Sequence, residues 1–125
     1  MSKRVLIADD AAFMREMLRD ILTEGGFGIA AEAIDGNEAI ELFGEHSPDL
    51  VMLDIVMPRK SGLEALKEIM ASNPNACVVM CSALGQETLV MDALEAGARD
   101  FIVKPFKPDK VLDVVEKALE KSLEG

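Results

Sequence analysis

Five side chains with useful chemistry each lie where an apolar, strand-like run of the sequence ends. They are three carboxylates, a hydroxyl and an ammonium group: Asp9, Asp10, Asp54, Ser82 and Lys104. In an open parallel α/β sheet, the carboxyl ends of the strands line the crevice in which ligands bind. Carboxylates gathered there repel one another, and a hard divalent cation with oxygen ligands, Mg²⁺ above all, is their natural partner. A metal beside a carboxylate, a hydroxyl and a lysine indicates phosphoryl chemistry.

Asp54 gives the sharpest of these signals, because it is a lone charge within the apolar stretch 50–58. A carboxylate oxygen beside a metal can attack phosphorus and form an aspartyl phosphate. Ser82 could bond a phosphoryl oxygen, although a hydroxyl at a strand end is as often a simple turn residue. Lys104 precedes Pro105, which favours an extended or turn geometry, and its ammonium could hold phosphate as a point charge. Each acid taken alone could be a helix cap or a solvated loop residue.

The elements that must position these residues follow from hydrophobic periodicity. Short apolar runs rich in β-branched residues predict strands over 4–8, 27–33, 49–53, 76–81 and 99–103. Segments with helical spacing lie between and after them. Capping boxes at Asp35/Glu38 and Ser61/Glu64 begin the second and third helices, and Pro108 begins the last. Gly25-Gly26 ends the first helix, and Gly97 ends the helix over 86–96.

The strict alternation of five strands with five helices predicts a single α/β domain. Near-continuous apolar strands indicate a parallel sheet that is covered on both faces. Because crossovers are right-handed, few topologies remain, and we choose the doubly wound, flavodoxin-like (βα)5 fold with strand order 2-1-3-4-5. In that order Asp9, Asp10 and Asp54 come together at the switch point between the first and third strands.

Composition excludes several classes of protein. The chain has 125 residues, half of them apolar, which suits one ordinary domain. No segment approaches the roughly 20 apolar residues that span a bilayer, and the apolar run 5–8 is too short for a signal peptide, so we expect a cytoplasmic protein without membrane insertion. The net charge of −10 argues against nucleic acid. Residues 97–125 carry six acidic and six basic side chains, so an acidic partner would be repelled least there.

The two cysteines do not indicate a disulfide or a zinc site. Cys77 and Cys81 are four positions apart on one predicted strand, a separation of roughly 13 Å. Neither a third cysteine nor a histidine joins them. We therefore expect reduced thiols in or near the core.

The five positions and their neighbours resemble the receiver domain of two-component response regulators. The matching segments are Asp9-Asp10, Leu53-Asp54-Ile55-Val56-Met57-Pro58, Ser82-Ala83 and Lys104-Pro105-Phe106, and the resemblance covers the whole chain, residues 1–125. The stretches 8–15 and 81–86 are most similar to the chemotaxis (CheY-like) branch of that family. The end of the chain at Gly125, without a linker, favours a complete single-domain protein.

The resemblance implies a role for each site residue. Asp54 would accept a phosphoryl group from a histidine kinase. The metal ligands for Mg²⁺ would be Asp10, Asp54 and the backbone carbonyl of Val56, with Asp9 assisting. Ser82 and Lys104 would hold the phosphoryl group.

The resemblance also implies a switch. On phosphorylation Ser82 would move toward the phosphoryl group and Phe101 would turn inward. The fourth helix, fifth strand and last helix would then bind a protein target such as the flagellar motor switch. A phosphatase is a further possible partner, and we expect a monomer. Such a protein catalyses its own phosphorylation and dephosphorylation but is a signalling switch rather than an enzyme.

Two positions depart from common features of the family. Phe101 lacks the hydroxyl of the tyrosine that is often found there, so an output that needs a phenol hydrogen bond is in doubt. Val56 and Leu84 are apolar where the family flanks the phosphoryl group. We hypothesise that both side chains impede the water that hydrolyses the acyl phosphate.

Other functions fit the sequence less well. Aspartate-nucleophile phosphatases usually carry a second aspartate two residues after the nucleophile, where this chain has Val56. A flavodoxin needs a phosphate loop rich in Ser, Thr and Gly after the first strand, where Asp9 and Asp10 would repel a phosphate. Within the receiver family, the alternatives are a phosphorelay intermediate and the excised receiver of a transcription regulator.

Overall fold

The protein alternates five strands with five helices. A computed structural model describes the backbone of residues 2–124 and the side chains of residues 2–120. The strands are β1 (Arg4–Ala8), β2 (Gly28–Ala33), β3 (Leu50–Asp54), β4 (Val78–Ser82) and β5 (Asp100–Val103). The helices are α1 (Ala12–Glu24), α2 (Gly36–His46), α3 (Gly62–Ser72), α4 (Glu87–Glu95) and α5 (Pro108–Glu124).

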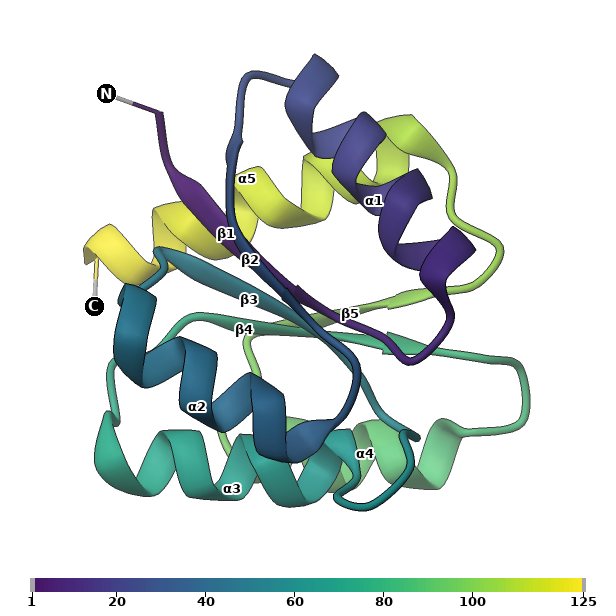
Figure 1. Cartoon of the computed structure of the whole chain (residues 1–125), viewed down its shortest axis with the longest axis vertical. Coiled ribbons are helices and arrows are strands. Elements are labelled where there is room, and N and C mark those ends of the chain that lie inside the picture. The colour runs from purple at the N-terminus through teal and green to yellow at the C-terminus, as the bar shows by residue number, and fades with distance from the viewer. Residues whose placement is uncertain (1, 125) are drawn as a thin grey trace.

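The strands form one parallel sheet in the order β2-β1-β3-β4-β5. Helices α1 and α5 cover one face of the sheet, and α2, α3 and α4 cover the other (Figure 1). The prediction of a doubly wound, flavodoxin-like (βα)5 fold with this strand order is confirmed. The order β2-β1-β3 places the end of β1 beside the end of β3, at the switch point.

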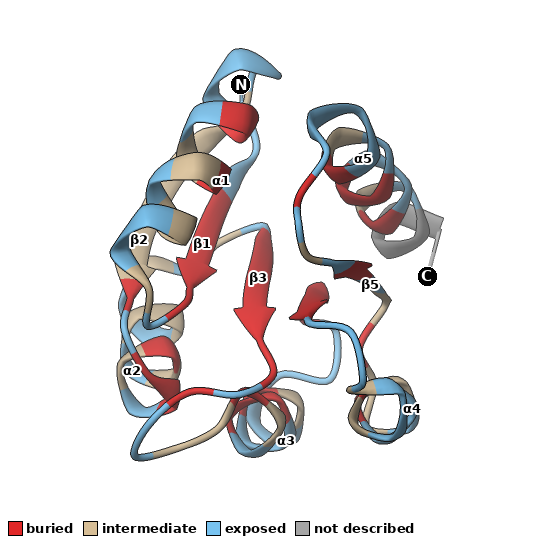
Figure 2. Ribbon diagram, turned by 90° about the vertical axis from the view of Figure 1, so that its right-hand side faces the viewer, coloured by how far each residue is buried: buried red, intermediate tan, exposed pale blue. Residues whose placement is uncertain are grey.

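Two apolar layers hold the helices on the sheet, and the inner strands β1, β3 and β4 are almost wholly buried between them, as the red arrows of β1 and β3 show (Figure 2). Along β3, Val51 and Leu53 face the layer of α2, α3 and α4, whereas Leu50 and Met52 face the layer of α1 and α5. Successive side chains of a strand point to opposite faces. A strand that is buried on both sides is therefore apolar throughout, which is the pattern seen in the sequence.

The strand ends differ slightly from the predicted ones, and two of these differences bear on function. β3 was expected to stop before Asp54, but Asp54 is its last residue and pairs in register with Cys81. β4 ends one residue later than expected, at Ser82. Both side chains are therefore fixed by the sheet rather than carried on a loop. The two cysteines are buried and free, as predicted.

One of the two predicted capping boxes is complete. Ser61 and Glu64 bond reciprocally at the start of α3. At α2 the Asp35 side chain accepts from the Glu38 backbone N–H as expected, but the Glu38 carboxylate accepts from the N–H of Ile34. The box at α2 was therefore only half correct, because the carboxylate reaches one residue further back along the chain.

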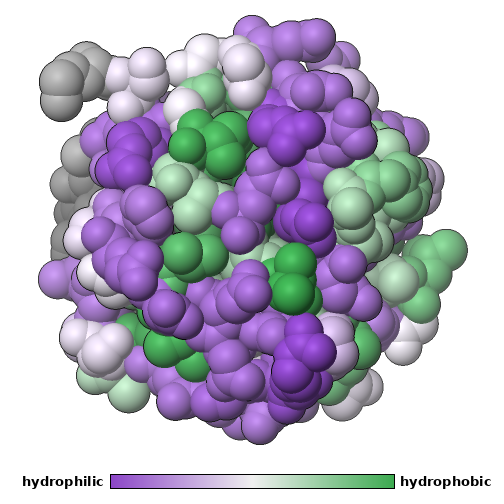
Figure 3. Space-filling model, viewed as in Figure 1, coloured by the Kyte–Doolittle hydropathy of each residue, from purple (hydrophilic) through white to green (hydrophobic). Residues whose placement is uncertain are grey.

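The surface is mainly polar, and its apolar side chains form separate small patches on the face seen in Figure 3. Among the residues that the structure describes, no helix is long and apolar enough to cross a membrane.

Candidate functional site

The predicted site residues converge at the carboxyl ends of the strands. Asp9 and Asp10 directly follow β1, Asp54 ends β3 and Lys104 directly follows β5. The backbone N–H of Lys104 donates to the Ser82 carbonyl over 2.8 Å, which continues the pairing of β4 with β5 past the last strand residue. The Lys104–Pro105 peptide bond is cis. The sheet therefore brings side chains from three distant parts of the sequence, at positions 9–10, 54 and 104, to one edge.

The three carboxylates form a cluster. One oxygen from each of Asp9, Asp10 and Asp54 lies within 4.8 Å of the others. Asp9 and Asp54 are buried, whereas Asp10 is exposed. Within the turn after β1, Asp9 Oδ1 accepts a hydrogen bond from the Ala11 backbone N–H over 2.9 Å. The cluster therefore opens to solvent on the side of Asp10.

Lys104 supplies the positive charge next to this cluster. Its Nζ donates to Asp54 Oδ2 over 3.1 Å and lies 3.0 Å from Asp9 Oδ2. Despite that ion pair, Asp9 Oδ2 has no hydrogen-bond partner within the described part of the chain. The Lys104 ammonium thus faces two buried carboxylates, and Asp9 Oδ2 can still accept a hydrogen bond or bind a cation.

Burial and neighbouring charges shift the pKa values of Asp54 and Lys104. Desolvation and the charge of Asp9 raise the pKa of Asp54 to about 6, although Lys104 and the Val56 backbone N–H act in the opposite direction. Burial opposes the charge of Lys104, but its contacts with Asp9 and Asp54 outweigh burial and raise its pKa. Lys104 therefore stays cationic at neutral pH, while Asp54 carries its negative charge at a cost.

The acidic cluster fits a hard divalent cation. The donors are carboxylate oxygens, which Mg²⁺ and Ca²⁺ prefer. Within residues 2–120, whose side chains the structure describes, Lys104 is the one cation in contact with both Asp9 and Asp54, and the raised pKa of Asp54 indicates that this cation does not fully compensate their negative charge. Asp9, Asp10 and Asp54 could hold such an ion together.

The other predicted residues lie on β4 and β5 or in the loops that follow β3 and β4. Ser82 is buried at the end of β4 and lines an apolar pocket between α4 and β5 that also contains Phe101. Val56 and Leu84 follow β3 and β4 with exposed fractions of 51% and 83%. Both side chains are exposed on loops at the carboxyl ends of neighbouring strands, and their effect on water access stays a prediction.

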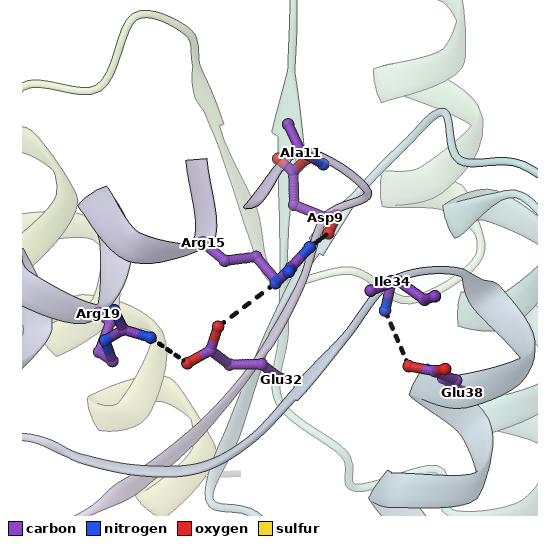
Figure 4. A network of polar contacts seen from close by, with 7 residues as sticks. All are labelled: Asp9, Ala11, Arg15, Arg19, Glu32, Ile34 and Glu38. Carbon is purple, nitrogen blue, oxygen red and sulfur yellow. Dashed lines mark hydrogen bonds and ion pairs between the residues drawn. The ribbon is translucent and has the colours of Figure 1, made fainter. Parts of the chain in front are cut away.

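The sequence analysis did not predict a second polar network, which bonds the loop that carries Asp9 and Asp10. Arg15 of α1 bonds both the Asp9 backbone carbonyl and Glu32 of β2, and Arg19 bonds Glu32 as well (Figure 4). A lone acid in the otherwise apolar strand 28–33 and two arginines four positions apart were the available signals.

These features are those of a known class of signalling domain. The family model for the response regulator receiver domain matches residues 5–116. The chain therefore belongs to the receiver domain family of response regulators. Domains of this family are switches rather than conventional enzymes, and they bind Mg²⁺ at an acidic pocket.

Within this family the chain is similar to chemotaxis proteins named CheY. It is 55% identical to CheY of Bacillus subtilis over 119 residues, which cover 95% of this chain and 99% of that protein. It is 54% identical to CheY of Thermotoga maritima over 117 residues, which cover 94% and 98% respectively. A solved complex of CheX, CheY, BeF₃ and Mg²⁺ from Borrelia burgdorferi contains a chain that is 45% identical, with a TM-score of 0.88 and coverage of 92% and 87%.

Proposed function

We propose that residues 1–125 are one receiver domain that acts as a single-domain response regulator of a two-component chemotaxis system. It accepts a phosphoryl group on Asp54 from a histidine kinase in the presence of Mg²⁺. In the phosphorylated state it binds a protein target such as the flagellar motor switch. The observation that carries this proposal is the contact of Lys104 with Asp54, inside a cluster of three carboxylates at the switch point.

The chemistry follows from the positions of the groups. A carboxylate oxygen of Asp54 attacks phosphorus, the bond from phosphorus to the imidazole nitrogen of the kinase breaks, and an acyl phosphate results. Bound Mg²⁺ supplies positive charge to the phosphoryl oxygens. Asp10, Asp54 and the Val56 backbone carbonyl would hold the ion, and Asp9 would assist. Because phosphoryl transfer depends mainly on positioning and charge neutralisation, a partly buried lysine beside the nucleophile is a suitable partner.

The output is a change at the pocket between α4 and β5. Ser82 and Phe101 line this pocket together, and Ser82 directly ends the strand next to Asp54. When Ser82 bonds the new phosphoryl group, its displacement opens space for Phe101 to turn inward. Phosphorylation adds negative charge, which can shift the equilibrium between two conformations of this pocket.

The comparisons support the chemotaxis role. The CheY proteins of two bacteria match over nearly their whole length, and the Borrelia complex shows a related CheY together with a second protein, CheX. We propose a kinase, a phosphatase and a motor-switch target for this chain, and a cytoplasmic location as a monomer.

The decisive experiment is to incubate the protein with acetyl phosphate and Mg²⁺ and to locate the adduct by mass spectrometry. We expect one phosphoryl group on Asp54, with no adduct in EDTA or in Asp54→Asn. The control Asp92→Asn removes an exposed acid of α4 and should label like the wild type. Absence of Mg²⁺-dependent label, or label that persists in Asp54→Asn, contradicts the proposal. Binding of the labelled protein to a motor-switch peptide then separates the chemotaxis role from that of a phosphorelay intermediate.

A further inference from the structure

The backbone of Asp9 is held from both sides. Its N–H donates to the Ala33 carbonyl over 3.1 Å, and its own carbonyl accepts from Arg15 Nη1 over 2.7 Å (Figure 4). That carbonyl belongs to the peptide group that joins Asp9 to Asp10. Because a peptide group is planar, fixing its oxygen also fixes the direction in which the chain enters Asp10.

Arg15 itself is held by the sheet. Its guanidinium Nε donates to Glu32 Oε1 over 3.3 Å, and only 16% of the Arg15 side chain is exposed. Glu32 lies on β2 and pairs in register with Ile7 of β1. The Glu32–Arg15 pair therefore links the acidic loop to a strand whose position is set by the sheet, not by the loop.

The other bonds that hold the loop act at different atoms from the Asp9 carbonyl: the Asp9 N–H bonds to Ala33, and Asp9 Oδ2 contacts Lys104. The N-cap of α1 is Ala11, which has no capping side chain, and its N–H bonds instead to Asp9 Oδ1. Without Arg15, the turn that carries Asp9 and Asp10 would keep this local bond but would lose its charged link to β2. A turn that moves more freely loses more conformational entropy when it binds a cation, and this loss weakens binding.

The charge of Arg15 is also compensated. An uncompensated positive charge on Arg15, close to the three carboxylates, would weaken the attraction of the site for a cation. Glu32 lies against both Arg15 and Arg19, so it reduces the positive charge that the arginines present to the site. Arg19 contacts Glu32 over 2.7 Å but has no hydrogen bond to the loop among the described residues.

We propose that Arg15, oriented by Glu32, is a positioning residue that presets the Asp9–Asp10 turn for the divalent cation. This inference rests on the proposed function, because that function supplies the cation. Arg15 touches neither the cation nor the phosphoryl group; it acts through the backbone carbonyl of Asp9.

The test is a calorimetric titration of the metal-free protein with MgCl₂, in the wild type and in three variants. Outer groups that orient metal ligands typically contribute 10-fold or more to metal affinity, so Arg15→Met should weaken Mg²⁺ binding about tenfold. Arg15→Lys keeps one donor and should recover part of that loss. The matched control Arg19→Met removes the shorter contact with Glu32 and should bind Mg²⁺ like the wild type. Wild-type affinity in Arg15→Met, or an equal loss in Arg19→Met, overturns the proposal.

Amide hydrogen exchange of Ala11 gives a second measurement that does not need the metal. Arg15→Met should speed exchange of this amide, whereas Arg19→Met should not, because of the two arginines it is Arg15 that bonds the Asp9 carbonyl. If the wild type binds no Mg²⁺, the proposed function fails, and the exchange rates alone decide whether Arg15 positions the loop. Equal exchange rates in both variants overturn the positioning role.

Discussion

Lys104 Nζ donates a hydrogen bond of 3.1 Å to Asp54 Oδ2, joining side chains that are 50 positions apart in the chain. The same ammonium lies 3.0 Å from Asp9 Oδ2. In the metal-free protein one cation therefore balances two buried anions. This imbalance has consequences for stability, metal binding and pH dependence that can be measured separately.

The contribution of Asp54 to the stability of the metal-free protein should become less favourable as the pH rises through the range of about 4 to 6. The folded state raises the pKa of Asp54 from 3.8 to about 6, so in this window the folded protein keeps a proton that the unfolded chain has released. Stability decreases with pH wherever the folded state binds more protons. The full cost is at most about 3 kcal/mol above pH 6, and it is absent below pH 4.

Urea unfolding in EDTA at several pH values measures this contribution as the difference between the wild type and Asp54→Asn. The variant lacks the titrating group, so it should gain stability relative to the wild type as the pH rises from 4 to 7. A difference that stays constant over that range contradicts the raised pKa. In parallel, Mg²⁺ affinity should weaken below about pH 6, because a proton then competes with the metal for Asp54.

Removal of the shared cation should destabilise the metal-free protein. Lys104→Met leaves Asp9 and Asp54 buried without a counter-charge, and breaking such a pair costs about 3 kcal/mol or more. The loss should be smaller at pH 5, where Asp54 takes up a proton. Mg²⁺ should raise the melting temperature of this variant more than that of the wild type.

The control for this measurement is Lys110→Met, which removes an exposed lysine of α5. Its stability should remain within about 0.5 kcal/mol of the wild type. If Lys104→Met melts like this control in EDTA, the carboxylates do not depend on the Lys104 ammonium.

Close packing at Gly62 should make this position intolerant of any side chain. A Cβ at Gly62 would lie 1.8 Å from the Asp54 carbonyl oxygen. Because the clash is with backbone, no rotamer can relieve it, and Gly62→Ala should lower the free energy of unfolding by at least about 3 kcal/mol. It should also displace Asp54 and so reduce labelling by acetyl phosphate.

Gly44→Ala is the matched control, because a Cβ at Gly44 has nothing within 4 Å. Gly44 lies inside α2, where replacement of glycine by alanine is expected to stabilise the protein by about 0.5–1 kcal/mol. Chemical denaturation of both variants should therefore give shifts of opposite sign. Equal shifts would mean that the contact between Gly62 and Asp54 does not constrain the site.

Exposed apolar side chains beside the cluster should slow loss of the phosphoryl group. Val56→Asn replaces a half-exposed methyl surface with an amide that can bind and orient water. We expect the phosphorylated variant to lose its label several-fold faster, as followed by mass spectrometry after removal of acetyl phosphate. An unaltered dephosphorylation rate rules out the idea. Unchanged urea unfolding confirms that any effect is local.

The sequence predicted most of the fold because each signal was local. Strand-like apolar runs, helical spacing and helix caps can each be recognised from neighbouring residues. Strands that are apolar throughout indicate a sheet that is buried on both faces. The strand ends were less accurate. Asp54 and Ser82 lie within the sheet and not just after it, because pairing with the neighbouring strand decides where a strand stops.

The candidate site was predicted in part for the same reason. Asp9, Asp10, Asp54 and Lys104 were found because strand-end positions in a parallel sheet meet at one edge, and the structure brings them together. Arg15 and Glu32 were not found, since nothing in their local sequence indicates that a helix residue reaches the carbonyl of Asp9.

The sequence by itself determined which segments form strands and helices and which acids lie at the strand ends, and it narrowed the order of the sheet to a few topologies. Those properties follow from periodicity and from the handedness of crossovers, which are independent of detailed packing. Only the tertiary structure decided that Asp9 and Asp54 are buried around one ammonium while Asp10 faces solvent. Burial and distance depend on how the layers pack, and they set the pKa of Asp54 and the charge that a metal must balance.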